Sequence, residues 1–147
     1  MNAYIVDTSV TIAWYLDETF SPAARTWQDR LLAGKVRLIV PSFHYWEFAN
    51  VLRTLVARRE MDAVLATEIL DLHLDAPLEL VDPDRRAVLD TALDYAATAY
   101  DAVFIALALA NEAPLITAER STTGWVTKLA AMVESVRFIP RTGNGIA

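Results

Sequence analysis

Four acidic residues in this chain follow short apolar segments, at the points where parallel strands would end or the next helices begin. Carboxylates gathered at one place raise one another's pKa values, and a divalent cation relieves their repulsion. Hard oxygen ligands of this kind suit Mg²⁺ or Mn²⁺, which can lower the pKa of a bound water and hold phosphate oxygens. The residues are Asp7, Glu47, Asp101 and Glu119.

The segments that must position these carboxylates alternate between short strands and longer helices. Strands separated by helices favour right-handed crossovers and a mostly parallel sheet covered on both faces. We therefore predict an α/β fold with a central sheet of four to five strands, whose ligands bind beyond the carboxyl ends of the strands. Strands are expected at residues 3–6, 36–40, 78–81, 114–117 and 136–139. Helices are expected at residues 10–15, 21–33, 41–59, 62–74, 84–98, 101–111 and 121–133.

Length and composition indicate one domain with a substantial apolar core. The chain has 147 residues, of which 54% are hydrophobic, and it contains no cysteine. Disulfides, thiolate nucleophiles and cysteine-based metal sites are therefore excluded. We expect a single domain over residues 1–147, with its core at about 3–139 and a loose tail at 140–147.

The charge balance is acidic, with 13 Lys and Arg against 19 Asp and Glu. A general basic footprint for nucleic acid is absent, although a bound cation can invert the field of an acidic pocket. No basic leader precedes the first apolar run, and the longest apolar stretch, residues 102–110, is shorter than the ~20 residues of a membrane helix. We expect a soluble cytoplasmic protein with no membrane partner.

Four short motifs resemble, in order, those of PIN-domain ribonucleases, and most closely those of the VapC toxins of toxin–antitoxin pairs. Residues 5–9 read Ile-Val-Asp-Thr-Ser, and residues 46–52 read Trp-Glu-Phe-Ala-Asn-Val-Leu. Residues 100–102 read Tyr-Asp-Ala, followed by Ile-Ala-Leu-Ala at 105–108, and residues 115–119 read Leu-Ile-Thr-Ala-Glu. The resemblance covers residues 3 to 139 and implies a three-layer PIN fold.

The resemblance also implies a Mg²⁺- or Mn²⁺-dependent endonuclease that hydrolyses RNA phosphodiester bonds. Asp7, Glu47 and Asp101 match the main acidic positions of the family, and Asp7 and Asp101 are the expected metal ligands. Glu119 stands where the family usually has Asp, and Ser121 stands where a further acidic residue is common. Glu47 and Glu119 are therefore expected to assist the metal or its water.

Three polar residues match supporting positions of the family. Ser9 matches a hydroxyl that orients the first Asp, Asn50 a polar position one turn beyond the catalytic Glu, and Thr117 a hydroxyl at the strand end. The resemblance further implies an RNA substrate, a VapB-like antitoxin that wraps the groove, and a homodimer. The apolar helix pair at residues 42–74 is a candidate contact surface, although core packing competes for the same residues.

Histidines and aromatic residues allow two interpretations each. His44 lies three residues before Glu47 and is either an acid or base near the site or, as we expect, a packed or surface side chain. His73 is expected at the surface. Four aromatic residues are expected in the core, with stacking on unpaired bases as the alternative; they are Trp14, Tyr15, Tyr45 and Trp46.

Three other classes of protein remain as alternatives. A haloacid-dehalogenase-type phosphatase needs Asp at the position of Ser9, which disfavours that class. A response-regulator receiver offers Asp82 as phospho-acceptor but lacks a Lys close after Thr117. A catalytically inactive PIN-like binding module is compatible with the Glu119 substitution.

Overall fold

A five-stranded parallel sheet forms the centre of the computed structural model, which describes residues 1–137. The strands are β1 (Asn2–Val6), β2 (Val36–Val40), β3 (Glu79–Leu80), β4 (Leu115–Thr117) and β5 (Val133–Ser135). The helices are α1 (Thr8–Ile12), α2 (Ser21–Leu32), α3 (Phe43–Ala57), α4 (Ala63–Leu74), α5 (Arg85–Tyr95), α6 (Ala99–Asn111) and α7 (Gly124–Lys128).

The strand order is β3-β2-β1-β4-β5, and every neighbouring pair is parallel. In the central pairs, Ile5 lies opposite both Ile39 of β2 and Leu115 of β4. The order reverses between β1 and β4, and α/β sheets bind ligands in the crevice beyond the carboxyl ends of strands at such a switch point. The mostly parallel α/β sheet predicted from the sequence is confirmed, and its switch point lies next to Asp7.

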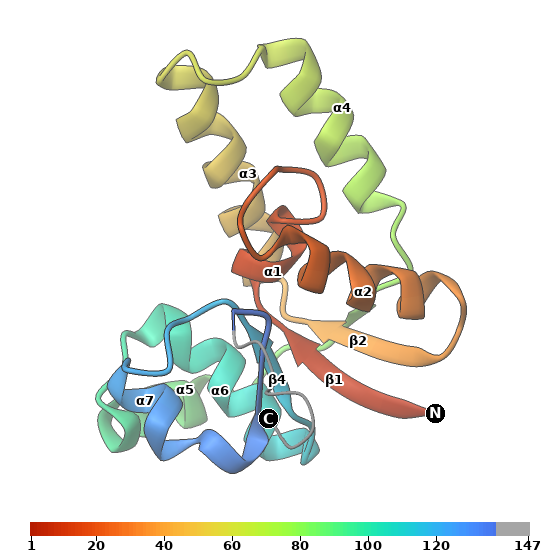
Figure 1. Ribbon diagram of the computed structural model, residues 1–147. Helices are drawn as coiled ribbons and strands as arrows, with labels where there is room; N and C mark the ends of the chain where they lie inside the picture. The colour runs from red at the N-terminus through yellow and green to blue at the C-terminus, as the bar shows by residue number, and fades with distance from the viewer. Residues whose placement is uncertain (138–147) are drawn as a thin grey trace.

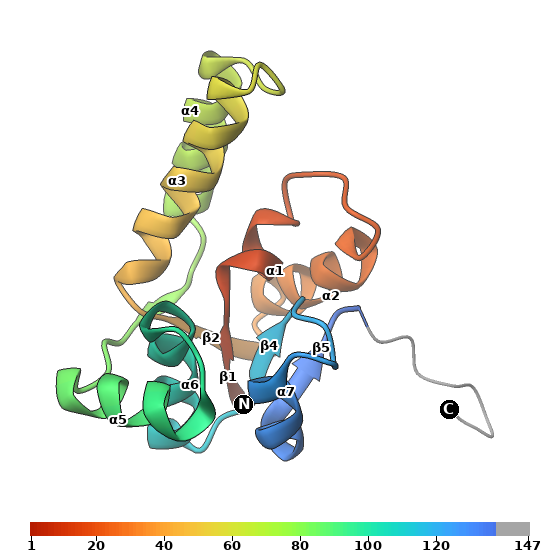
Figure 2. The same cartoon turned by 90° about the vertical axis from the view of Figure 1, so that its left-hand side faces the viewer.

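Different helices cover the two faces of the sheet (Figures 1 and 2). Val6 and Ile116 belong to an apolar cluster with α1 and α2, whereas Ile5 and Leu115 belong to one with α6 and α7. Successive residues of a strand point to opposite faces, so these continuous apolar runs serve both layers. The three-layer arrangement predicted from the sequence is therefore confirmed.

Helices α3 and α4 form a hairpin that projects from the sheet (Figure 1). Its base is held by a third apolar cluster, in which Phe48 and Leu52 of α3 meet Ile69 of α4 and Ile12 of α1. Large apolar side chains are also exposed along α4: Val64 and Leu65 near the tip of the hairpin, and Leu72 and Leu74 near its base. Helix α4 therefore contributes both to the core and to an exposed apolar face, the two roles expected to compete for residues 42–74.

Several helices begin with a side-chain N-cap close to the residue at which the sequence predicts a helix to begin. Asp7, Asp62 and Asp84 accept hydrogen bonds from backbone N–H groups in the first turns of α1, α4 and α5. Such caps satisfy donors that a helix end leaves unpaired. Helix α1 begins at Thr8, directly after its cap, two residues earlier than predicted.

The C-terminal third differs most from the expected elements. The helix predicted at 121–133 is shorter, consisting of α7 and a 3₁₀ turn at Ala130–Met132. The fifth strand was predicted at 136–139 and lies instead at Val133–Ser135, because pairing of β5 with β4 sets the strand. Residues 138–139 and the tail at 140–147 lie outside the described residues.

Within residues 1–137, no single helix has the length and apolar composition that would let it cross a membrane. Helices α5 and α6 meet those criteria only as a pair, and they are bent by 105° relative to each other.

Candidate active site

Asp7 lies at the end of the central strand β1 and caps helix α1. Its Oδ1 accepts hydrogen bonds from the backbone N–H of Ser9, at 3.1 Å, and from the Ser9 hydroxyl. The Ser9 oxygen in turn accepts the N–H of Ala118 at 3.1 Å, which joins the ends of β1 and β4. The predicted supporting residue Ser9 therefore lies against Asp7.

Burial raises the pKa of Asp7 from 3.8 to about 7. Hydrogen bonds from Ser9 and Thr117 oppose this rise in pKa, and the charges of Glu47 and Asp101 add to it. Loss of hydration disfavours a carboxylate more than two hydroxyl donors can compensate. Asp7 therefore holds a proton far more tightly than an exposed Asp does.

Glu47 lies on the second turn of α3 and is half-buried. Its Oε1 accepts the hydroxyl of Thr8, the first residue of α1, at 2.8 Å. Burial raises the pKa of Glu47, the Thr8 hydrogen bond opposes the rise, and the charge of Asp101 adds to it. Glu47 is thus oriented by α1 and lies within electrostatic reach of the Asp residues.

Asp101 lies in the first turn of α6, where its backbone N–H donates to the Oγ1 of the capping residue Thr98 at 3.0 Å. Burial raises the pKa of Asp101, and the charge of Glu119 adds to the rise. The indole of Trp125 opposes it. By distance and angle, however, the buried Nε1 of Trp125 has no hydrogen-bond partner among the described residues. We conclude that this N–H acts on Asp101 as a nearby dipole and is free for a closer contact.

Glu119 follows β4 and is partly buried. Its N–H donates to Thr117 Oγ1 at 3.0 Å, and its Oε2 accepts the Thr123 hydroxyl at 3.3 Å. Thr117 also contacts Asp7, so this second supporting residue touches both the first and the last of the four acidic positions. The charges of Asp7, Glu47 and Asp101 influence one another, and Glu119 joins this group through Asp101.

The donor chemistry of these residues fits a divalent cation, but they do not form a closed cage. Within residues 1–137, no set of three or more His, Asp or Glu side chains is arranged to hold a metal ion. Mg²⁺ is commonly bound by one or two carboxylates, with waters and substrate phosphates completing its shell. Mutually repelling, partly buried carboxylates are suited to that mode.

An open cavity of about 360 Å³ adjoins Glu47, and aromatic rings form much of its wall. Phe43 and Tyr100 stack with ring centroids 5.4 Å apart and an interplanar angle of 12°. Trp46 is 72% exposed and Tyr100 is 64% exposed, so flat apolar surface faces solvent beside a carboxylate. The lining residues are Phe43, Trp46, Glu47, Asn50 and Tyr100.

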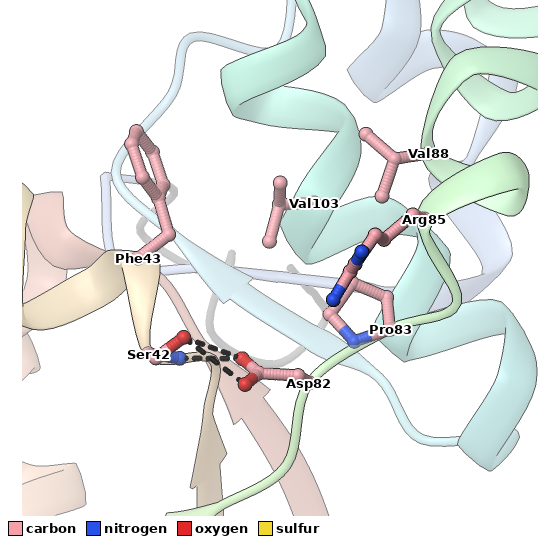
Figure 3. Close-up of a pocket in the computed structure, with 7 residues that line it drawn as sticks. All are labelled: Ser42, Phe43, Asp82, Pro83, Arg85, Val88 and Val103. Carbon is pink, nitrogen blue, oxygen red and sulfur yellow. Dashed lines mark hydrogen bonds between the residues drawn. The ribbon is translucent and has the colours of Figure 1, made fainter.

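A second cavity, of about 510 Å³, lies between the ends of β2 and β3 and helices α5 and α6 (Figure 3). Asp82 accepts hydrogen bonds there from the backbone N–H and hydroxyl of Ser42, at 2.7 and 2.8 Å. Phe43 borders both cavities, and Arg85 supplies a cation to the second. The neighbouring cavity therefore carries one cation, Arg85, and one carboxylate, Asp82, which is held by Ser42.

Sequence reasoning placed several residues near Glu47 wrongly or missed them. His73 was expected at the surface but is 0% exposed, whereas the packed position that was one expectation for His44 is found. Trp46 was expected in the core and is exposed, whereas the core position of Trp14 is confirmed. Thr8, which contacts both Glu47 and His44, was not singled out. A hydroxyl next to Asp7 was the only signal in the sequence that pointed to it.

The chain belongs to the PIN-domain family: the model of that family matches residues 4–121. PIN domains are generally nucleases that depend on a divalent metal. Membership excludes the phosphatase and receiver alternatives. No curated protein sequence matches the chain significantly.

Solved structures with the same fold include PAE2754 from Pyrobaculum aerophilum, with a TM-score of 0.71 and 22% identity over 92% of this chain and 85% of that one. VapBC2 from Rickettsia felis, bound to a DNA fragment from its promoter, has a TM-score of 0.62 and 14% identity over 90% and 98% of the two chains. A toxin–antitoxin complex from Klebsiella pneumoniae has a TM-score of 0.61 and 14% identity over 92% and 99%.

Proposed function

We propose that this PIN domain is a Mg²⁺- or Mn²⁺-dependent ribonuclease and the toxin of a toxin–antitoxin pair. The observation that carries the proposal is the electrostatic coupling of Asp7, Glu47 and Asp101 at the switch point of the sheet. These residues are 94 positions apart at their extremes, and only the fold brings them within reach of one another. A cluster of three carboxylates at this place in a PIN domain supports the hydrolysis of phosphodiester bonds.

Asp7 and Asp101 would hold the ion, and Glu47 and Glu119 would lie beside it. When bound, the ion supplies an acidified water and a counter-charge for phosphate oxygens. Ser9 and Thr117 hold the Asp7 carboxylate at the end of β1, so that it does not have to reorganise when substrate binds.

The cavity beside Glu47 supports an unpaired RNA substrate. Aromatic faces bind bases of single strands without requiring a particular sequence. We assign one base to the exposed rings of Trp46 and Tyr100, within reach of the Asn50 amide. The next phosphate along the strand would cross Phe43 towards Arg85, whose charge suits it.

The toxin assignment draws on the solved structures of toxin–antitoxin complexes with this fold. A VapB-like antitoxin would cover the acidic groove, because an exposed nuclease site requires a reversible block. We assign the homodimer contact to the exposed apolar side chains of α4, which are Val64, Leu65, Leu72 and Leu74. Light scattering after size-exclusion chromatography tests the dimer, and Leu65→Glu should yield a monomer.

The nuclease assignment is tested by incubating the purified chain with fluorescent single-stranded RNA, with Mg²⁺, Mn²⁺ or EDTA. We expect metal-dependent cleavage, abolished by Asp101→Asn and retained by Asp62→Asn, which changes an exposed capping residue. Cleavage by Asp101→Asn at the wild-type rate would overturn the assignment. RNA binding without cleavage by the wild type would favour the inactive binding module.

A further inference from the structure

Two fully buried histidines face each other between helices α3 and α4. His44 and His73 are joined by a hydrogen bond of 2.7 Å between their Nε2 atoms. Phe48 stacks on His73, with ring centroids 4.1 Å apart and planes 8° from parallel. A polar ring in such apolar surroundings lowers the stability of the fold unless each ring nitrogen has a hydrogen-bond partner.

Both remaining nitrogens are paired, and the pairs extend the contact into a chain. His44 Nδ1 lies 3.1 Å from Thr8 Oγ1, and the Thr8 hydroxyl reaches Glu47 Oε1 at 2.8 Å. At the other end, His73 Nδ1 lies 3.0 Å from the Tyr15 hydroxyl. Four hydrogen bonds thus connect Tyr15, at the side of the hairpin base, with the carboxylate of Glu47.

The direction of every hydrogen bond follows from the carboxylate end. An ionised carboxylate only accepts, so the single hydroxyl hydrogen of Thr8 is committed to Glu47. Thr8 must then accept from His44, which places a hydrogen on His44 Nδ1. Burial and the charge of His73 lower the pKa of His44 to about 3, so His44 is neutral and its Nε2 is an acceptor.

The tautomer of the second ring, His73, follows by the same reasoning. His73 must donate from Nε2 to His44, and burial lowers the pKa of His73 to about 4, so His73 is also neutral. Its Nδ1 therefore accepts from the hydroxyl of Tyr15. This single arrangement leaves no nitrogen unpaired, and hydrogen bonds aligned in one direction polarise and strengthen one another.

We propose that Tyr15, His73, His44 and Thr8 form a positioning relay that holds Glu47 Oε1 and presents the other carboxylate oxygen to the substrate cavity. The proposal rests on the proposed function, because it assigns these residues to the orientation of the Glu47 carboxylate. None of the four is a catalytic residue. A Leu pair would fill the same space without polar atoms to satisfy, so the histidines serve more than packing.

The first test measures the ring tautomers directly and requires no RNA cleavage. Two-bond nitrogen–proton NMR correlations of the metal-free protein at neutral pH should show His44 protonated at Nδ1 and His73 protonated at Nε2. The signals are assigned by their loss in His44→Leu and His73→Leu. The opposite tautomer in either ring would overturn the relay, whether or not the chain proves to be a ribonuclease.

The second test separates positioning from stability. Thr8→Val removes the donor to Glu47 at constant shape and should lower kcat about tenfold or more with little change in KM, whereas Thr8→Ser should restore kcat. The double variant His44→Leu/His73→Leu leaves no orphaned nitrogen. It should unfold at a higher urea concentration than either single variant, yet keep a low kcat. Recovery of kcat together with stability would make the pair purely structural and overturn the proposal.

Discussion

Replacing Asp7 by Asn should stabilise the metal-free protein while abolishing its activity. Asn has the same shape, remains a good helix cap and can still accept from Ser9. It lacks the charge that burial makes unfavourable, burial being the main reason that the pKa of Asp7 is raised to about 7. Its amide nitrogen, in place of one oxygen, can donate to Thr117 Oγ1 instead of accepting from it. The site is therefore expected to hold a carboxylate at a cost in folding free energy.

The size and pH range of this effect follow from linkage. An Asp with a pKa of 3.8 in the unfolded chain and about 7 in the fold is protonated only in the folded state between these values. Folded wild type thus binds more protons than the unfolded chain, and its stability falls as pH rises from about 4 to about 7. At about 1.4 kcal/mol per pH unit, the loss is ~4 kcal/mol, as an upper bound because water reaches part of the carboxylate.

Urea denaturation in EDTA, at about pH 4 and about pH 8, measures this difference. Asp7→Asn should match the wild type at the lower pH and exceed it by up to ~4 kcal/mol at the higher pH. Asp62→Asn is the matched control, because Asp62 also caps a helix but is exposed, and it should change little. Equal free energies of unfolding for wild type and Asp7→Asn at both pH values would refute the reasoning. Added Mg²⁺ should stabilise the wild type and not Asp7→Asn.

Three further predictions concern neighbouring residues. Glu47→Gln and Asp101→Asn should each lower kcat at least ~100-fold without unfolding the protein, as followed by RNA cleavage and circular dichroism. Trp46→Ala should raise KM for single-stranded RNA roughly tenfold through the loss of about 1–3 kcal/mol of stacking, whereas Leu93→Ala, on the exposed face of α5, should not change KM. Phe48→Ala, two residues beyond Trp46, should cost ~3–5 kcal/mol in urea denaturation because Phe48 is fully buried, with Trp46→Ala as its exposed counterpart.

The central strands could be predicted because their local sequence and their tertiary role agree. Residues 3–6, 36–40 and 114–117 are short apolar runs rich in β-branched side chains, and buried parallel strands require that composition. Asp7 and Glu119 could then be placed at one edge, since the carboxyl ends of parallel strands lie on the same side. That step needs only topology, and the structure has both residues beside the end of β4.

The edges of the fold could not be predicted in this way. Strand β5 has three residues, and its start at Val133 depends on pairing with Leu115 of β4. The contact is invisible in a local window of sequence. Helix α5 ends at Tyr95 because Ala96 adopts a left-handed conformation, with φ of 50°. Alanine favours helices, so its presence in the sequence does not indicate that a helix ends there.

The errors around Glu47 have a common physical cause. His73 and Trp46 were each assigned by the average behaviour of their residue type, under which histidine avoids a dry core and tryptophan avoids solvent. Each departs from that average close to the same site: Trp46 lines the cavity of Glu47, and His73 reaches the Glu47 carboxylate through His44 and Thr8. Sequence rules describe what stabilises a fold, so they are expected to fail where a residue is kept for another reason. Both departures lie beside one carboxylate, and both concern side chains that packing alone would place differently, so they agree with the role proposed for Glu47.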